Sequence, residues 1–525
     1  MRKFFELNLL PEEIINEDTL RIIVSKRVGI KLNTIKQATI IKKSIDARKD
    51  PITYRVKLAL DIIENGNSDD LPERKQEIHY NDVSNGERVI VIGAGPCGLF
   101  ASLKLIALGF KPIILERGKK IEERKKDIAS IFKDKTIDEE SNFSFGEGGA
   151  GTFSDGKLYT RSNKRGSIEE VLDIFINHGA DKEIKVDAHP HIGTDKLSTI
   201  IKNIRKTIIS SNGEYHFNTK VVDLIVRNNR IKGVITQNGD RIEANYVVLA
   251  TGHSARDIFY LFNSKKWLIE KKPFAMGVRV EHPQEIINKI QYHSKNYSPL
   301  LPAASYNLTY TYKNRGVFSF CMCPGGMIIP ASTQKGLSLV NGMSNSLRNS
   351  PFANSGIVVS ILEEDALEYS DYGELALMKL QEDLEKKIYN ITSNETSAPI
   401  QRLSDFLKNK KSSSFAETSY LCDLVSVNFN NILPKNITNN LIGAFRNFDQ
   451  KMKGFISPEA NIIGLESRTS SPVRILRDNE SLEHKQISGL YPCGEGSGYA
   501  GGITSSCIDG IRVAQKISET CNKIF

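Results

Sequence analysis

The sequence predicts an α/β protein in which a parallel-sheet domain follows a small N-terminal module and is interrupted by an α+β insertion. Three observations support this class. Residues 88–118 (RVIVIGAGPCGLFASLKLIALGFKPIILERG) combine a β-branched run, a glycine turn and a helical segment. Residues 246–252 and 490–502 return to short buried strands that end in glycine turns, as parallel α/β sheets do. Residues 274–455 lack any βαβ rhythm.

The N-terminal module covers residues 1–62, and its pattern predicts the order β-α-β-β. The stretch NEDTLRIIVSKRVGI has helical periodicity, whereas TIKQATIIKKSIDAR and PITYRVKLALDI alternate like strands. Residues 63–86 are polar and rich in Gly, Asn and Asp. We expect them to form a linker, with room for one short strand.

The stretch from Val89 to Phe110 is long and apolar enough to suggest a membrane span, since its one charged side chain is Lys104. Its internal order favours another interpretation. The β-branched run 89–92 suits a buried parallel strand, and a glycine turn and a helical segment follow it. A second apolar run, 112–115, completes a βαβ unit of the Rossmann type. We therefore expect residues 87–273 to begin a dinucleotide-binding domain.

The glycine turn has the spacing G-x-G-x-x-G, and each position has a physical role. Gly93 permits the tight turn, Gly95 lets a pyrophosphate approach the backbone, and Gly98 lets the helix pack closely on the sheet. The helix N-terminus offers free N–H groups and a positive dipole to the phosphates. Glu116, at the end of the second strand, is placed to accept hydrogen bonds from ribose hydroxyls.

A second glycine-rich stretch, SNFSFGEGGAGTFSDGKLYTR, spans residues 141–161. One interpretation is a flexible surface loop. The other is an ordered backbone cradle over phosphate or flavin, where glycines permit close approach. Phe143, Phe145 and Phe153 are unusual in a flexible linker and favour the cradle.

Two later segments return to the parallel sheet. A helix is expected near 197–211, and strands then lead to Tyr246–Ala250, which ends at Thr251 and Gly252. Residues 456–525 form the final return, where a strand ends at Gly494-Glu495 and Gly501-Gly502 begins a helix. That helix N-terminus would face an anion, and the alternative is a purely structural turn.

The motifs VIGAGPCGLFASL, GEGGAGTFSDGKL, HPHIGTDKL, LATGHSARD, FSFCMCPGG and CGEGSGYAGGITSSCIDG resemble a family of uncharacterised FAD-dependent, or NAD(FAD)-utilising, dehydrogenases. The resemblance covers nearly the whole chain and implies the glutathione-reductase-like FAD fold with bound FAD. It gives, together with the glycine turns, the following candidate cofactor residues: Gly93, Gly95, Pro96, Gly98, Glu116, Arg117, Gly148, Gly149, Thr152, Val221, Thr251, Gly252, Gly494, Glu495, Gly501, Gly502 and Ile503.

Four residues are candidates for catalysis. Cys321 and Cys323 form a C-x-C motif and suggest a redox-active thiol near the flavin, although a disulfide between them requires distortion of a regular strand. His191, in DAHPHIGTD, is a candidate hydrogen-bonding group, and we expect no metal site. His253 follows the second glycine turn, where it either donates a proton or holds the loop.

Composition limits the class of protein and its partners. The net charge of +9, from 71 basic and 62 acidic residues, is modest, so nucleic acid is not an expected partner. The basic run 117–135 mixes in acidic side chains and is typical of a solvated helix face. The cysteines are scattered and the first residues are too polar for a signal peptide. We expect a cytoplasmic protein without a membrane anchor.

The leading functional hypothesis is an FAD-dependent oxidoreductase that acts on a small organic substrate by hydride transfer. Residues 274–455 would be its inserted substrate or cap domain. No second G-x-G-x-x-G occurs in a βαβ context, so NADH or NADPH would act only as a transient donor. The alternatives are a non-catalytic FAD-binding scaffold and an RNA-modifying FAD-binding protein.

Overall fold

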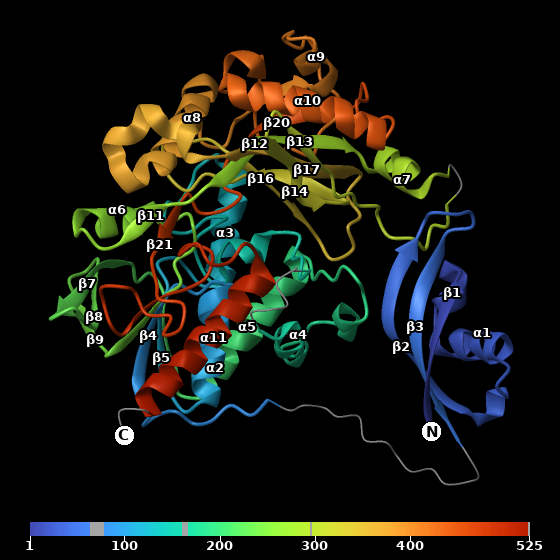
Figure 1. Ribbon diagram of the computed structural model, residues 1–525, viewed down its shortest axis with the longest axis horizontal. Coiled ribbons are helices and arrows are strands. Elements are labelled where there is room, and N and C mark those ends of the chain that lie inside the picture. Colours follow the sequence, from blue (N-terminus) through green and yellow to red (C-terminus); the bar gives the residue numbers. More distant parts are fainter. Residues whose placement is uncertain (64–77, 160–165, 295–296, 523–525) are drawn as a thin grey trace.

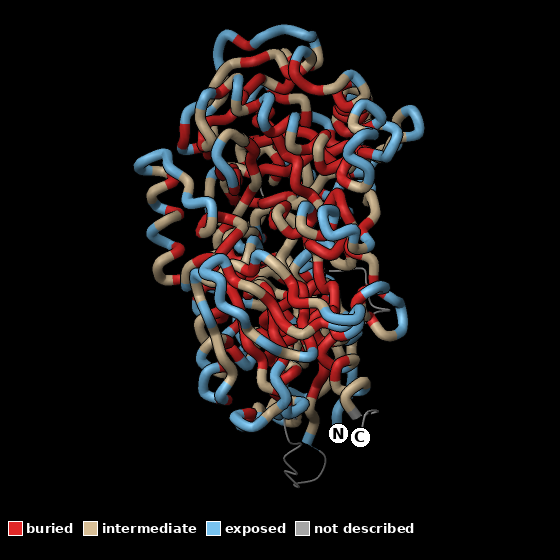
Figure 2. Tube along the Cα trace, turned by 90° about the vertical axis from the view of Figure 1, so that its left-hand side faces the viewer, coloured by how far each residue is buried: buried red, intermediate tan, exposed pale blue. Residues whose placement is uncertain are grey.

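The computed structural model describes residues 1–63, 78–159, 166–294 and 297–522 (Figure 1). Its helices and strands form a small N-terminal domain, a parallel-sheet layer and a larger sheet covered by helices. In Figure 2 the buried segments run through the centre of the molecule and the exposed segments lie at its periphery.

The N-terminal domain has the predicted β-α-β-β order. Its elements are β1 (Arg2–Leu9), α1 (Glu17–Val28), β2 (Ile35–Asp46) and β3 (Thr53–Ile62). The three strands pair antiparallel in the order β1-β3-β2. Asn16 caps α1 by accepting a hydrogen bond from the Thr19 N–H at 2.8 Å, and Gly29 ends the helix at φ 71°. Part of the expected linker, 64–77, lies outside the described residues, and 78–86 contain no helix or strand.

The parallel sheet has the strand order β22-β10-β4-β5-β6, and all its neighbouring strands are parallel. Its strands are β4 (Arg88–Ile92), β5 (Lys111–Leu115), β6 (Glu214–His216), β10 (Tyr246–Leu249) and β22 (Leu490–Pro492). The helices beside it are α2 (Pro96–Ala107), α3 (Ile121–Lys133), α4 (Ile168–Asn177), α5 (Thr194–Ser210) and α11 (Ile503–Asn522). The predicted α/β fold with a parallel sheet is confirmed.

Both faces of this sheet are buried, which explains its continuous apolar runs. Val89 and Val91 pack into the core formed with α2, α5 and α11, whereas Ile90 and Ile92 pack on the opposite side. That side is covered by the antiparallel strands β7 (Val221–Arg227), β8 (Arg230–Thr236) and β9 (Arg241–Glu243), and by α6 (Arg256–Ser264). Most of the apolar stretch 89–110 is therefore buried in the protein core. No helix in the described ranges has the length and apolarity to cross a bilayer.

The larger sheet has seven strands in the order β13-β14-β17-β12-β20-β18-β19, and β18–β19 is its one parallel pair among the described residues. Its strands are β12 (Phe274–Pro283), β13 (Thr309–Tyr312), β14 (Arg315–Cys323), β17 (Phe352–Ile361), β18 (Ala398–Arg402), β19 (Leu424–Ser426) and β20 (Asn461–Glu466). Helices α7 (Gln284–Tyr292), α8 (Ala376–Thr392), α9 (Leu403–Leu407) and α10 (Lys435–Lys451) flank it (Figure 1). Two smaller pairs join β11 (Ile269–Lys271) to β21 (Val473–Ile475) and β15 (Gly326–Pro330) to β16 (Val340–Ser344).

The expected division between residues 455 and 456 lies one strand too early. The strand β20 (461–466) pairs with β12 and β18 in the middle of the larger sheet, so the chain leaves this sheet only after Glu466. All residues of β20 are buried. A short strand buried on both faces has the same apolar pattern in either sheet, so its sequence does not reveal to which sheet it belongs.

Candidate functional site

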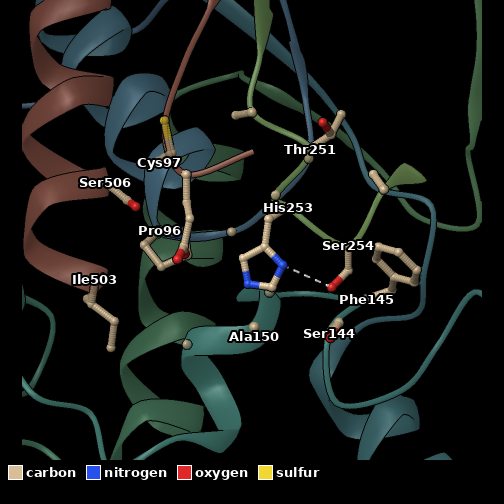
Figure 3. A pocket seen from close by; sticks show the side chains of 18 of the residues that line it. Pro96, Cys97, Ser144, Phe145, Ala150, Thr251, His253, Ser254, Ile503 and Ser506 are labelled. Atoms are coloured by element: carbon tan, nitrogen blue, oxygen red, sulfur yellow. Dashed lines mark hydrogen bonds between the residues drawn. The ribbon is translucent and has the colours of Figure 1, made fainter. Parts of the chain in front are cut away.

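A cavity of about 380 Å³ lies between the parallel sheet and the larger sheet. It is bordered by the turn between β4 and α2, the glycine-rich stretch, the end of β10 and the start of α11. Cys321 of β14, in the larger sheet, and Asn341 of β16, in the separate β15–β16 pair, also border it. Figure 3 shows His253, Ala150 and Pro96 around this space. The carboxyl ends of β4 and β10 meet here, as expected for a ligand site in an open α/β sheet.

Most of the candidate residues line this cavity. They are Gly93, Gly95, Pro96, Glu116, Arg117, Gly149, Val221, Thr251, Gly252, Glu495, Gly501, Gly502 and Ile503, with His253 and Cys321. Segments that lie far apart in the sequence therefore meet at one site.

Six candidates lie outside the lining: Gly98, Gly148, Thr152, His191, Cys323 and Gly494. A Cβ at Gly98 would lie 2.0 Å from the Gly93 carbonyl oxygen, so the helix packs where only glycine fits. The Thr152 hydroxyl donates to the Glu147 carbonyl at 3.3 Å, and the His191 Nε2 atom lies 3.1 Å from the Ser346 carbonyl oxygen. The Gly494 N–H donates to the Asp509 carboxylate at 2.9 Å.

The glycine-rich stretch is an ordered cradle as far as residue 159, and its residues 160–161 lie outside the described ranges. Its short 3-10 helix, η3 (Gly149–Phe153), docks on the glycine turn. The Gly148 N–H donates to the Ala94 carbonyl at 2.8 Å. A Cβ at Gly149 would lie 3.0 Å from the Gly95 Cα atom, so glycine permits this close approach.

Glu116 has a structural role that the sequence did not suggest. Its buried carboxylate accepts hydrogen bonds from three backbone N–H groups, those of Ala94 at 2.9 Å, Gly118 at 2.8 Å and Gly146 at 3.0 Å. It therefore joins the glycine turn to the cradle. The Oε2 atom accepts only the Ala94 bond among the described contacts, so it retains capacity for a ligand hydroxyl.

Several lining residues were missed, among them Lys157, Asn341 and Arg468. Lys157 lies within the glycine-rich stretch 141–161, and this position was an available indication. Asn341 lies on β16 of the β15–β16 pair, and Arg468 follows β20 of the larger sheet; no local motif marks either residue.

Comparison with known proteins decides the family. Residues 273–469 match a family described as "FAD-dependent protein, C-terminal domain-like". Residues 1–61 match a domain of unknown function, and residues 191–300 match glucose inhibited division protein A. An uncharacterized protein of Clostridium beijerinckii is 38% identical over 519 residues, which cover 94% of this chain and 95% of that protein. The chain belongs to this family of FAD-dependent proteins.

Solved structures give a more distant similarity to this FAD-dependent protein. The crystal structure of CtdE in complex with FAD has a TM-score of 0.33 at 11% identity, covering 82% of this chain and 84% of that chain. A geranylgeranyl bacteriochlorophyll reductase-like protein from Thermoplasma acidophilum has a TM-score of 0.35 at 13% identity, covering 83% and 80%.

The residues of this FAD-dependent protein fit the cofactor that the family implies. A Cβ at Gly95 would meet only the Gly149 Cα atom, at 3.9 Å, and Cβ atoms at Gly252, Gly501 and Gly502 would meet nothing within 4 Å. These glycines therefore border open space. Gly95 is also the N-cap of α2, and Gly501 and Gly502 precede α11. Two helix N-termini thus face one cavity, an arrangement suited to the pyrophosphate and to the anionic edge of reduced flavin.

His253 is half-buried and lies in the middle of the site (Figure 3). Burial, together with the positive charges of Arg468 and Arg256, lowers the pKa of His253 to about 3. The imidazole is therefore neutral at physiological pH in the FAD-free protein. Its Nδ1 atom lies 3.3 Å from the hydroxyl oxygen of the adjacent Ser254.

Glu495 borders the same cavity near Lys272 and Cys321. Burial raises the pKa of Glu495 to about 7, and the positive charge of Lys272 offsets only part of this effect. Near neutral pH this carboxyl group therefore exists in both protonation states.

The substitution Glu495→Gln is expected to change the pH dependence of stability. The folded-state pKa lies above the ordinary value of 4.5, so the folded protein binds more protons between these two values. The contribution of Glu495 to stability thus becomes more unfavourable as pH rises from about 4.5 to about 7. Thermal unfolding of the FAD-free protein is measured at pH 5 and pH 8. The stability of the variant relative to wild type should be greater at pH 8 than at pH 5. Exposed Glu459→Gln is the control, and equal differences at both pH values would contradict the expectation.

Proposed function

We propose that this protein is an FAD-dependent oxidoreductase that transfers hydride between flavin and a small organic substrate. One observation carries the proposal. A single cavity extends from the glycine turn at Gly95 to Cys321 of the larger sheet and Asn341 of the β15–β16 pair. The cavity therefore has one end suited to a dinucleotide and another formed by a different part of the chain, where a substrate would contact the redox-active ring.

The residues of the chain would divide the binding of FAD between them. Gly95 and the N-terminus of α2 would hold the pyrophosphate, and Glu495 would accept hydrogen bonds from ribityl hydroxyls. Gly501 and Gly502, before α11, would face the ring. Bound FAD would supply the two-electron redox step, and the protein would position the ring and exclude water.

The substrate end of the cavity includes a fixed positive charge. Arg468 lies there, and its guanidinium donates to the Thr333 hydroxyl at 2.7 Å and to Glu385 at 2.9 Å. These contacts fix the cation at the cavity wall, where it would orient a polar group of the substrate. NADH or NADPH would reach the flavin only transiently, because the sequence has no second G-x-G-x-x-G motif within a βαβ unit.

The test is the visible spectrum of the purified protein, reconstituted with FAD where necessary, before and after anaerobic addition of NADH or NADPH. We expect a bound flavin that bleaches with one of the two donors. A bound flavin that stays oxidised with every donor tried, substrate candidates included, would support the scaffold alternative. Failure to bind FAD would overturn the proposal. Co-purifying nucleic acid with salt-sensitive affinity would instead favour an RNA-modifying role.

A further inference from the structure

The strand β14 is distorted at Cys321 and Cys323. Phe320 pairs with Gly356 whereas Cys323 pairs with Asn354, so β14 contains one residue more than its partner β17 between these pairs. Cys321 has φ 44°, in the left-handed region that residues other than glycine rarely occupy. Such a backbone persists only where its surroundings impose it, and it is frequent at functional sites.

This bulge brings the two cysteine side chains together. In a regular strand two residues advance the chain by about 6.6 Å, whereas a disulfide requires Cβ atoms about 3.5–4.5 Å apart. Here the Cys323 side chain turns back on Cys321: its Sγ atom lies 3.3 Å from the Cys321 carbonyl oxygen, and the two thiols are close enough to shift each other's pKa. The distortion that a C-x-C disulfide requires is therefore already present in the fold.

The two thiols have different access to the cavity. Cys321 is partly exposed and lines the cavity together with Glu495 and Gly502. Cys323 is fully buried behind it, in contact with β17. One thiol can therefore react with groups in the cavity, and the other can reach only its neighbour.

Two cations hold this segment and act on the thiols. Lys157 Nζ donates to the Met322 carbonyl, and Arg279 Nη1 lies 3.4 Å from the Cys321 carbonyl oxygen. Arg279 is itself fixed by Glu466 at 2.8 Å. The adjacent Cys323 thiol and the charges of Lys157 and Arg279 lower the pKa of Cys321 to about 6, although burial opposes this shift. The interaction with the Cys321 side chain, together with burial, raises the pKa of Cys323, so the partly exposed thiol of Cys321 is the nucleophile of the two.

We propose that Cys321 and Cys323 are a redox-active dithiol–disulfide pair that exchanges two electrons with the flavin of this cavity. The inference rests on the proposed function, because flavin must occupy the cavity. When the pair is oxidised, two S–H bonds break and one S–S bond forms. Two electrons and one proton pass to oxidised flavin, and the second proton leaves to solvent; reduced flavin reopens the disulfide by the reverse step.

The first experiment uses the FAD-free protein and requires no variant. The protein is equilibrated in buffers of oxidised and reduced dithiothreitol, quenched, alkylated and digested, and the peptide containing residues 321–323 is analysed by mass spectrometry. We expect reversible loss of two hydrogens and of both alkylation sites. The same digest reports on a second pair, Cys97 and Cys493, whose buried Sγ atoms lie 3.0 Å apart. The oxidation state of that pair is read from other peptides and does not affect the result for residues 321–323. A 321–323 peptide that is alkylated at every potential would overturn the inference.

The second experiment counts electrons in the FAD-loaded protein by anaerobic reductive titration. Oxidised wild type should take up four electrons per FAD, two for flavin and two for the disulfide, whereas Cys321→Ser and Cys323→Ser should take up two. Cys422→Ser, a buried cysteine outside the site, should behave as wild type. Uptake of two electrons by fully oxidised wild type would overturn the inference and leave the proposed function intact. A protein that binds no FAD would overturn both.

Discussion

Replacing Gly95 with valine is expected to weaken FAD binding by at least about 100-fold, or about 2.8 kcal/mol, while the fold is retained. Gly95 has φ −76° and ψ −177°, an extended conformation that any residue adopts. Within the protein a Cβ at this position would meet only the Gly149 Cα atom, at 3.9 Å. The branched side chain would therefore fill the space next to the α2 N-terminus, where the pyrophosphate is expected.

The measurement is FAD affinity by flavin fluorescence, with circular dichroism and thermal unfolding on the same samples. Gly95→Ala should give a smaller loss of affinity. Gly98→Ala is the matched contrast, because its Cβ would lie 2.0 Å from the Gly93 carbonyl oxygen, and it should lower stability. If Gly95→Val bound FAD as wild type does, the glycine turn would not be the pyrophosphate site.

The sequence predicted those parts of the fold that local pattern determines. The strand β4, the glycine turn and the helix α2 are adjacent in the chain, and each was predicted from the pattern of its own residues. The N-terminal β-α-β-β order is equally local. The position of β20 was missed because its buried apolar pattern suits either sheet, and only its pairing with β12 and β18 decides between them.

In the candidate site, too, the residues that belong to local motifs were predicted, and those that depend on long-range contacts were not. The residues of the glycine turns line the cavity because their role depends on the backbone. Arg468 was missed, because its contact with Glu385 joins segments that are distant in sequence. The bulge at Cys321 was missed for a related reason, since it depends on the pairing of β14 with β17 and not on the C-x-C motif.

Loss of Glu385 is expected to have the largest effect on stability. This carboxylate of α8 is fully buried and lies 3.0 Å from Arg256 and 2.9 Å from Arg468, with a further hydrogen bond from the Ser467 hydroxyl at 2.7 Å. Glu385→Ala would leave two buried guanidinium groups without this partner. Breaking such a pair destabilises a protein by about 3–5 kcal/mol. Lys516→Ala, which removes the exposed pair with Glu519, should cost no more than about 1 kcal/mol.

The pH dependence distinguishes lost charge pairing from lost packing. Burial alone would raise the pKa of Glu385, but Arg256 and Arg468 lower it to about 2, below its ordinary value of 4.5. The contribution of the ion pairs is therefore present in full above pH 4.5 and is lost as pH falls toward 2. Urea unfolding of wild type and Glu385→Gln at pH 7 and pH 3.5 should show a smaller difference at the lower pH. An unchanged difference would assign the effect to packing, and Arg468 would then owe its place at the cavity wall to its other contacts.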